Sequence, residues 1–285
     1  TSMKDTPTKI KCSVGILTFN SAGTLRRALD SVSALAEVVI CDGGSTDDTL
    51  AIAREYGCTI IAQDPAHKNP DNTIRDFSGM RNQCLDATTF DWFLYIDSDE
   101  AASPELVEDI RRIVERDEAP YIYKVPIRNF VVDHEIKYSS NYPGYQHRFF
   151  GKRSGARFIK NVHERIDFDK NVHVPVPLTS PWFVYLSEDE VNHYVRNTIG
   201  YVHREVERSK HITSWGYVYW VLGVNSLTMA KTAIRSTRNY LLHGFRDSMP
   251  IRMELGRIAY VFAVMYHITK YQVRRVLRSV FSSQS

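Results

Sequence analysis

The sequence predicts an α/β fold, in which a mainly parallel sheet is covered by helices on both faces and followed by a helical C-terminal extension. Three observations support this fold class. Short apolar segments alternate with segments of helical periodicity over about the first hundred residues, a pattern typical of right-handed βαβ crossovers. Polar residues directly follow three of the apolar segments, at the strand ends where parallel sheets bind ligands. Beyond residue 192, apolar residues recur at helical spacing.

The predicted elements alternate strictly up to residue 116. Strands are expected at 11–19, 37–41, 59–62 and 92–96, and helices at 24–34, 45–56, 77–88 and 104–116. Ser45 or Thr46 can cap the second helix, because a side-chain oxygen at that position accepts from the first free backbone N–H groups. Ser103 and Pro104 begin the last of these helices with a cap and a proline in the first turn.

The remaining chain first continues the sheet and then becomes helical. Residues 121–132 alternate and are rich in β-forming side chains, whereas residues 142–165 are aromatic, basic and irregular. Three further helices are expected at 192–210, 215–242 and 251–281. We therefore predict two domains, residues 1–185 for the sheet and residues 186–285 for the helical extension.

Composition limits the class of protein. The chain has 285 residues, of which 43% are hydrophobic and 24% charged, as in ordinary soluble globular proteins. Its net charge of +3 gives no polyelectrolyte character, so no nucleic-acid partner is expected. The four cysteines lack metal-ligand spacing and favour a reducing, cytoplasmic setting. No signal peptide is visible, and the longest apolar stretch, 258–268, is too short to span a bilayer. We therefore expect no transmembrane segment.

The last predicted helix is amphipathic and basic. Residues 252–285 contain six Arg or Lys and one acidic residue, and apolar side chains recur along one side of the helix. Such a helix suits an anionic membrane surface, which would make the protein peripheral on the inner face of the membrane. An ordinary helix, packed on its own domain or on a second copy of the chain in a homo-oligomer, is the alternative.

The most informative motif is Asp97-Ser98-Asp99-Glu100, which follows the apolar segment 92–96. Two carboxylates one residue apart at the end of a buried strand repel each other unless a cation lies close by. Oxygen ligands of this kind suit a hard divalent cation that also binds a substrate diphosphate. The motif therefore predicts Asp97 and Asp99 as metal ligands, although Asp-x-Asp also occurs in ordinary solvated loops.

Two further polar clusters are expected at the same edge of the sheet, because the carboxyl ends of parallel strands meet there. Thr18 and Asn20 end the first strand, and Asp42 and Gly43 end the second. Glycine lets the backbone approach a ligand closely, and Asp42 can accept from a ribose hydroxyl or a base N–H. A tight strand-to-helix turn without a ligand explains the same residues. The sequence contains neither a Walker phosphate loop nor a dinucleotide-type Gly-x-Gly-x-x-Gly.

Four more residues are candidates for charge stabilisation and proton transfer. Arg81 can present its planar guanidinium to a diphosphate, although a surface arginine is the commoner outcome. Arg148 belongs to the basic stretch that also contains His163 and Glu164. These last two are adjacent, so they can share a site in a loop but not on a strand. In a loop, Glu164 is a candidate general base for an acceptor hydroxyl, and His163 a candidate metal ligand or phosphate contact.

Together these motifs resemble family 2 glycosyltransferases of the GT-A fold, whose mainly parallel sheet is Rossmann-like. The resemblance covers about the first hundred residues and rests on residues 14–20, 38–49, 81–82 and 92–100. Residues 142–150 and 162–164 resemble, more loosely, the branch that includes lipopolysaccharide-core glucosyltransferases of the WaaE type. Many relatives have Asp-Asp-Gly-Ser where this chain has Asp42-Gly43-Gly44-Ser45. Gly43 thus removes one nucleoside-binding carboxylate.

The resemblance implies an inverting glycosyltransferase that uses a nucleotide-sugar, usually a UDP-sugar, together with Mn²⁺ or Mg²⁺. It implies that Asp99 is the direct metal ligand beside Asp97 and that Glu164 is the catalytic base. The implied acceptor is a hydroxyl of a glycan or a lipid-linked glycan in cell-envelope or surface-polysaccharide synthesis, for example of lipopolysaccharide. The implied donor contacts come from Thr18, Asn20, Asp42, Gly43, Arg81, Asp97 and Arg148.

Two other functions fit parts of the sequence. A non-catalytic relative that binds a nucleotide-sugar or a glycan would keep the same fold and much of the same rim. A sugar nucleotidyltransferase has a related sheet and an acidic metal site. It would need a Gly-rich, Lys-containing phosphate loop near the N-terminus, and this sequence has none.

Overall fold

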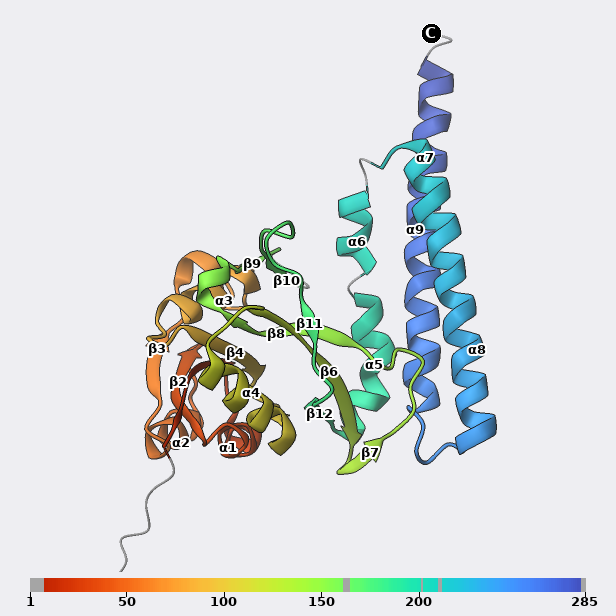
Figure 1. Cartoon of the computed structure of the whole chain (residues 1–285). Coiled ribbons are helices and arrows are strands. Elements are labelled where there is room, and N and C mark those ends of the chain that lie inside the picture. Colours follow the sequence, from red (N-terminus) through yellow and green to blue (C-terminus); the bar gives the residue numbers. More distant parts are fainter. Residues whose placement is uncertain (1–7, 161–164, 201, 210–211, 283–285) are drawn as a thin grey trace, which may run out of the picture. The chain divides into compact units, whose positions relative to one another are not determined.

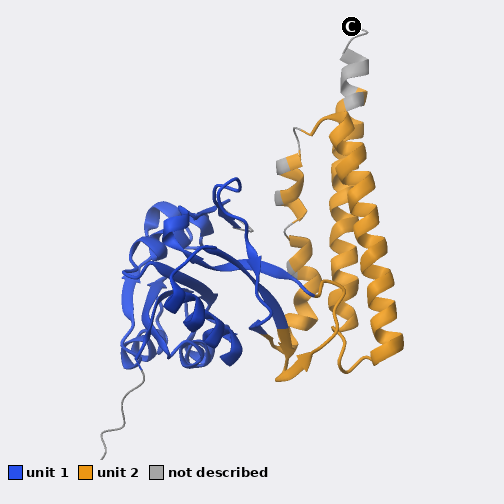
Figure 2. Ribbon diagram, viewed as in Figure 1, with its two compact units in different colours: residues 1–128, 143–184 blue, residues 129–142, 185–285 orange. Residues whose placement is uncertain are grey.

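The computed structural model of the chain describes residues 8–160, 165–200, 202–209 and 212–282 (Figure 1). The chain forms two compact units (Figure 2). The first contains residues 1–128 and 143–184, and the second contains residues 129–142 and 185–285. The second unit thus includes a segment, 129–142, that the sequence placed in the first domain. The functional domains 1–185 and 186–285 stay a prediction.

One half of the sheet consists of four parallel strands. In spatial order they are β3 (Thr59–Ala62), β2 (Leu35–Asp42), β1 (Ile10–Thr18) and β4 (Trp92–Asp97). In the register of these strands, Thr18 lies beside Asp42, and Leu17 lies beside both Cys41 and Asp97. The strands predicted for this part of the sequence are confirmed. The polar clusters that follow β1, β2 and β4 therefore lie at one edge of the sheet.

The other half of the sheet is largely antiparallel. β8 (Tyr145–Gly151) pairs with β4 and is followed by β6 (Ile122–Val131), β12 (Trp182–Leu186) and β5 (Glu100–Ala102). Shorter strands complete the arrangement: β11 (Val176–Pro177) and β7 (His134–Ile136) pair with β6, and β9 (Arg157–Ile159) pairs with β10 (Arg165–Asp167). The sheet is mixed, and the predicted α/β class is confirmed.

The prediction that residues 142–165 are irregular was wrong. β8 lies between β4 and β6, and its Phe149 and Phe150 are completely buried. The prediction failed because a strand containing Arg148 looks exposed in the sequence. In the structure Arg148 is buried as well, since it forms an ion pair with Glu100, which lies far away in the sequence.

Helices cover both faces of the sheet in the first unit. α1 (Ala22–Ser31), α2 (Thr49–Glu55) and α4 (Pro104–Arg116) pack against one face, where Val14 and Ile16 of β1 lie in the core. α3 (Phe77–Asp86) covers the other face through Cys84 and Leu85. Two short 3₁₀ turns, η1 (Pro65–His67) and η2 (Lys152–Ser154), lie in the connections. The predicted helices are confirmed, and Ser103 caps α4 by accepting from the backbone N–H of Leu106 at 3.0 Å.

The prediction that Ser45 or Thr46 caps the second helix was wrong. α2 begins at Thr49, and no side chain caps it at Asp48. The hydroxyl of Ser45 instead donates to the carboxylate of Asp42 at 2.5 Å. Residues 45–48 therefore form a loop at the end of β2, and the helix starts only after this loop is complete.

The second unit is mainly helical. Its helices are α5 (Glu188–Gly200), α6 (Val202–Arg208), α7 (Ser214–Gly216), the π-helix η4 (Tyr217–Val224), α8 (Asn225–His243) and α9 (Ile251–Ser282). α9 packs against α5, α6 and α8. Its buried Glu254 accepts from the backbone N–H of Ser140 at 2.9 Å and pairs with Arg257 at 3.1 Å. Among the residues that the structure describes, no helix combines the length and the apolar character needed to cross a bilayer.

Candidate active site

The carboxylate of Asp42, at the end of β2, organises the loop that follows it. Thr18 Oγ1 donates to Asp42 Oδ1 at 2.9 Å, and the hydroxyl of Ser45 donates to the same oxygen. The backbone N–H groups of Gly44 and Ser45 both donate to Oδ2 at 2.8 Å. Burial opposes ionisation, but the hydrogen bonds from Ser45, Thr18 and Gly44 hold the pKa of Asp42 below its ordinary value. Asp42 is therefore a buried anion held by four neutral donors.

The residues on either side of Asp42 complete this loop. The side-chain oxygen of Asn20 accepts from the backbone N–H of Thr46 at 2.8 Å, and Asn20 has a φ of 50°. The backbone N–H of Gly43 donates to the carbonyl of Thr18 at 2.8 Å. A Cβ on Gly43 would lie 3.0 Å from Gln63 Oε1 and 3.2 Å from the Thr18 carbonyl oxygen. Glycine thus allows the ends of β1 and β2 to approach closely, and a larger side chain here would displace a neighbour.

The carboxylate of Asp97, at the end of β4, lies between two arginines. Arg81 Nη2 is 2.7 Å from Asp97 Oδ1, and Arg148 Nη2 is 3.9 Å from Asp97 Oδ2. Burial works against ionisation, but the positive charges of Arg81 and Arg148 outweigh it and hold the pKa of Asp97 below its ordinary value. Arg81 is buried, and its guanidinium lies 4.6 Å from the centre of the Tyr95 ring. The alternative of an ordinary surface arginine at position 81 was therefore wrong.

Glu100 is the most enclosed carboxylate of the acidic motif. Both of its oxygens accept from the guanidinium of Arg148, with Nη2 and Oε1 2.8 Å apart. It also accepts from the backbone N–H of Asp97 at 2.8 Å and from the indole N–H of Trp182 at 3.1 Å. Burial raises the pKa of Glu100 to about 7, against the opposing effect of Arg148. Glu100 therefore fixes both the start of the Asp97 turn and the position of Arg148.

This geometry changes the role that we assign to Arg148. Its guanidinium is occupied by Glu100 and is enclosed by the rings of Tyr95 and Trp182, at 4.6 Å and 4.5 Å from their centres. It therefore positions the acidic motif, whereas the sequence predicted a direct contact with the donor. Glu100 was missed as a site residue, although it stands directly after Asp99 in the motif that drew attention to this strand.

The carboxylates of Asp97 and Asp99 suit a cation that is shared with a ligand. Among the described residues, no three His, Cys, Asp or Glu side chains lie close enough to hold an ion. Asp99 is half-buried, and its carbonyl accepts from Arg27 at 3.4 Å. Mg²⁺ and similar ions are commonly bound by one or two carboxylates together with substrate phosphates, which Asp97 and Asp99 can supply. The predicted ligand His163 and the predicted base Glu164 lie outside the described residues.

One exposed aromatic residue at the rim was not singled out by the sequence. Phe19 follows β1 directly, its side chain is 59% exposed, and a Cβ on Gly43 would lie 3.1 Å from its ring. Lys68 reaches the same place from the loop after β3, since its ammonium group donates to the carbonyl of Gly43 at 3.0 Å. A large exposed aromatic directly after a buried strand is the signal that could have identified Phe19.

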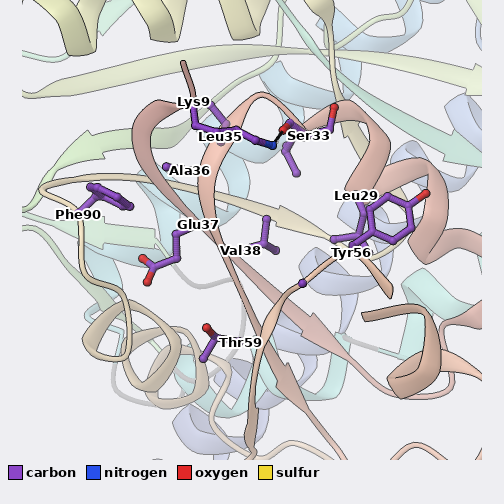
Figure 3. A pocket seen from close by; sticks show the side chains of 12 residues that line it. Lys9, Leu29, Ser33, Leu35, Ala36, Glu37, Val38, Tyr56, Thr59 and Phe90 are labelled. Carbon is purple, nitrogen blue, oxygen red and sulfur yellow. Dashed lines mark hydrogen bonds between the residues drawn. The ribbon is translucent and has the colours of Figure 1, made fainter. Parts of the chain in front are cut away.

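A pocket of about 370 Å³ opens at the other edge of the sheet (Figure 3). Lys9, Leu35 and Thr59 line it near the amino ends of β1, β2 and β3. The carboxylate of Glu37 also lines it, but it already accepts from the backbone N–H of Thr89 at 2.8 Å. Ligands of parallel sheets bind beyond the carboxyl ends of the strands. We therefore place the candidate site at the Asp42 and Asp97 edge.

Comparisons with known proteins give one family. The model of glycosyl transferase family 2 matches residues 13–171. A TPR repeat-containing protein of Synechococcus elongatus is 32% identical over 149 residues, which are 52% of this chain and 33% of that protein. The lipopolysaccharide core biosynthesis glycosyltransferase LpsC of Rhizobium meliloti is 26% identical over 165 residues, 58% of this chain and 56% of LpsC. The chain thus spans between a third and just over half of the length of these relatives.

Solved structures with a similar arrangement include S. aureus TarS 1–349 in complex with UDP. It has a TM-score of 0.43 and 13% sequence identity, and the superposition covers 92% of this chain and 91% of that one. The glucosyl-3-phosphoglycerate synthase of Mycobacterium tuberculosis, in complex with Mn²⁺ and UDP-glucose, has a TM-score of 0.32 and 25% identity over 42% of this chain and 43% of its own.

Proposed function

The chain belongs to glycosyl transferase family 2, and from this membership we propose that it transfers a sugar from a nucleotide-sugar, a UDP-sugar, to a hydroxyl of its acceptor. The GT-A fold class of the family agrees with the observed sheet, its covering helices and the helical extension. The observation that best supports an active site is the group formed by two buried arginines, the buried Glu100 and the half-exposed Asp97 at the end of β4, beside the ordered Asp42 loop.

We propose that the nucleoside of the donor lies at the ends of β1 and β2. Thr18, Asn20 and Asp42 hold this loop in one conformation, and Gly43 keeps its surface open. Asp42 uses its hydrogen-bonding capacity within the loop, so we assign the direct contacts to backbone groups of the loop and to Phe19. This assignment accounts for the missing second carboxylate at Gly43, because the backbone supplies the polar contacts.

The diphosphate of the donor would then lie toward β4. Arg81 is the arginine closest to Asp97, and an approaching diphosphate offers its guanidinium a second anion of suitable shape. We propose that Asp99, with Asp97 beside it, would hold Mn²⁺ or Mg²⁺ together with the diphosphate. Such an ion would stabilise the negative charge that develops on the departing nucleotide. His163 as a further ligand stays a prediction.

Proton transfer is assigned to Glu164, which stays a prediction because it lies outside the described residues. A carboxylate on the face of the sugar opposite the diphosphate can remove the proton from the attacking acceptor hydroxyl. The hydroxyl oxygen then forms the new bond at the anomeric carbon while the bond to the diphosphate breaks, so a single displacement inverts that carbon. No other proton acceptor is needed for this step.

The acceptor is proposed to be a glycan or a lipid-linked glycan of the cell envelope, as in lipopolysaccharide synthesis. The name of the relative LpsC supports this class. In the second unit, Trp215, Trp220 and Phe262 are each more than half exposed, and α9 also carries Lys270 and Arg274 beside a mainly apolar groove. Aromatic and basic side chains of this kind suit the surface of an anionic membrane. A homo-oligomer that covers the same groups is the alternative.

The decisive experiment measures UDP release from several UDP-sugars with Mn²⁺, with EDTA, and with an oligosaccharide acceptor. We expect turnover that EDTA abolishes and that falls at least 100-fold in both Asp99→Asn and Glu164→Gln. Lys11→Gln, an exposed change on β1 away from the rim, serves as the control. A binding protein would show no turnover, and only Asp99→Asn would weaken its hold on UDP. A nucleotidyltransferase would consume a nucleoside triphosphate and release pyrophosphate.

A second measurement tests the membrane contact. The protein is sedimented with vesicles of neutral lipid and with vesicles that contain an anionic lipid. We expect binding to the anionic vesicles that is weakened by Lys270→Gln together with Arg274→Gln, and by high salt. Equal recovery in the supernatant with both vesicle types, together with a mass that doubles in solution, would favour the oligomer.

A further inference from the structure

A second pocket of the first unit is lined mainly by basic groups. It has a volume of about 360 Å³, within the range of small-molecule sites. Its lining contains five basic side chains and one acidic side chain, Asp167. The basic ones are Lys124, His147, Arg165, Lys170 and His173. Ile166, Phe168 and Pro175 add an apolar wall. The pocket therefore combines positive charge with a surface on which a sugar ring can lie.

Two of the cations that line this pocket have no carboxylate partner among the described residues. In the part of the chain that the structure describes, neither Lys124 nor Lys170 takes part in an ion pair. Burial, followed by the charges of Lys124 and Lys170, lowers the pKa of His147. The two lysines are thus close enough for their charges to act on the half-buried imidazole. Two neighbouring lysines without an ion pair attract an anion from solution.

The imidazoles of the pocket are held by aromatic contacts. The ring of His147 packs against Phe168, with 5.6 Å between the ring centres, and that of His173 packs against Tyr121 at 6.3 Å. Both histidines are half-buried. Their positions are therefore defined before any ligand binds, which reduces the conformational entropy that binding would cost.

A β-bulge connects this pocket with the acidic motif. In the pairing of β6 with β8, Tyr123 lies opposite Phe149, and Val125 lies opposite Gln146. Lys124 therefore faces two residues of β8, His147 and Arg148. Bulges often redirect side chains beside active sites. Here His147 lines the pocket, whereas the next residue, Arg148, pairs with Glu100 and approaches Asp97.

We propose that this pocket binds an anionic group, a phosphate or a carboxylate, carried by the acceptor sugar. Lysine and arginine form strong charge-assisted hydrogen bonds with both anions. The pocket is lined by His147, which directly precedes Arg148 on β8, and Arg148 is the group that positions Asp97. Its role as an acceptor subsite rests on the proposed transfer reaction, whereas its binding of an anion does not.

Direct binding to the full chain tests the proposal. The probes are glucose 1-phosphate, glucuronate and neutral glucose. Their binding is measured by calorimetry and by the NMR signals of the histidine rings. We expect one or both anionic sugars to bind and to shift the signals of His147 and His173, while glucose does neither. The anionic sugar that binds more tightly shows whether the pocket prefers a phosphate or a carboxylate. Equal binding of glucose, or no binding of either anionic sugar, would overturn the proposal.

Charge-removing variants locate the binding. Lys124→Gln combined with Lys170→Gln is expected to lower the affinity for the anionic sugar at least tenfold. Lys170→Gln alone is an exposed change that cannot unfold the sheet, and it is expected to lower the affinity several-fold. Lys11→Gln is the matched control for the loss of one positive charge outside the pocket and is expected to bind like the wild type. Unchanged affinity in both pocket variants would place the anion elsewhere and refute the assignment.

The failure of this proposal differs from the failure of the proposed function. Asp99→Asn is expected to weaken the binding of UDP and to leave the affinity for the anionic sugar unchanged. If UDP binds and turns over but the anionic sugars do not bind, only the pocket is wrongly assigned. If the anionic sugars bind but the wild type neither holds nor cleaves UDP-sugars, the pocket stands and the transfer reaction is wrong.

Discussion

Asp42 and Asp97 end the strands on either side of β1, but different groups hold the two carboxylates. Asp42 accepts four hydrogen bonds from hydroxyl and backbone N–H groups. Asp97 is held by the charges of Arg81 and Arg148. The donors that hold Asp42 are neutral, so none of them is a cation that a ligand could replace as its partner. An ion pair can exchange partners: under the proposed function, a metal ion and a diphosphate would offer Asp97 and Arg81 new partners of the same signs.

The comparison assigns a different role to each end of the rim. The Asp42 loop provides a shaped surface, which suits the recognition of a nucleoside. The Asp97 end provides a set of charges whose balance would change if a diphosphate and a cation bound there, as the proposed function has it. Both oxygens of Glu100 accept from Arg148, so Glu100 would hold Arg148 in place while Asp97 changes partner.

The largest effect on stability is expected at the buried pair of Arg148 and Glu100. Arg148→Met leaves Glu100 without its cation, and breaking a buried pair of this kind costs about 3–5 kcal/mol. Unfolding by urea measures the loss. Arg157→Met removes an exposed partner of Asp86 and should cost under about 1 kcal/mol.

A double replacement tests whether the loss comes from the unpaired charge. Glu100→Gln with Arg148→Met removes both charges and should recover part of the stability that Arg148→Met loses. If the effects of the two single replacements simply add, the two groups do not act as a pair, and the account of Asp97 given above loses its support.

A smaller effect is expected at Asp42. In Asp42→Asn, the amide oxygen can still accept from the backbone N–H groups of Gly44 and Ser45, but the amide NH₂ replaces the oxygen that accepts from the hydroxyls of Thr18 and Ser45. Losing the charge that these four hydrogen bonds share is expected to cost about 1–3 kcal/mol. Valine has nearly the same shape as threonine, so Thr18→Val removes only the hydrogen bond to Asp42 and should cost about 1 kcal/mol. Urea unfolding gives both values, and faster amide exchange at Gly44 and Ser45 in Asp42→Asn would locate the damage. A cost for Thr18→Val that exceeds that of Asp42→Asn would contradict the assigned roles.

The stabilisation by Asp42 should depend on pH with a defined sign. Its pKa in the folded protein lies below its ordinary value of 3.8, so the folded state binds the proton less readily than the unfolded state. The contribution is therefore complete above the ordinary pKa and is lost as the pH falls through the folded pKa. The difference in unfolding free energy between wild type and Asp42→Asn should stay constant between about pH 8 and pH 5 and shrink below about pH 4. A difference that grows on acidification would reverse the assigned direction.

The sequence was sufficient for features that depend on neighbouring residues. The parallel strands and the helices between them follow from local apolar periodicity, and the right-handed crossover then brings Thr18, Asp42 and Asp97 to one edge. The acidic motif was visible because its residues are consecutive. These features make up the first half of the sheet and the outline of the site.

Features that depend on distant partners could not be predicted. Arg148 is buried in β8 only because Glu100, which lies 48 residues earlier in the chain, neutralises it. For Arg81, which the sequence predicted as a donor contact, a surface arginine stayed open as the alternative until its partner Asp97 was known. Ser45 was predicted to cap a helix, but the carboxylate of Asp42 competes for its hydroxyl. Both arginines have a charged partner from another segment, whereas the partner of Ser45 lies three residues away and was overlooked because a helix cap also explains a serine there.

The smallest effect on stability is expected at Phe19, on the Asp42 side of the rim. Its side chain is 59% exposed, so Phe19→Ala should change the free energy of unfolding by no more than about 0.5 kcal/mol. If the nucleoside base stacks on this ring, the same change should weaken the binding of UDP by about 1–3 kcal/mol, the range for bases stacked on aromatic side chains in proteins that bind single-stranded nucleic acids. Calorimetry with UDP and with inorganic pyrophosphate separates the two halves of the donor. A loss for UDP alone places the base at Phe19, whereas equal losses for UDP and pyrophosphate would move the nucleoside away from the Asp42 loop.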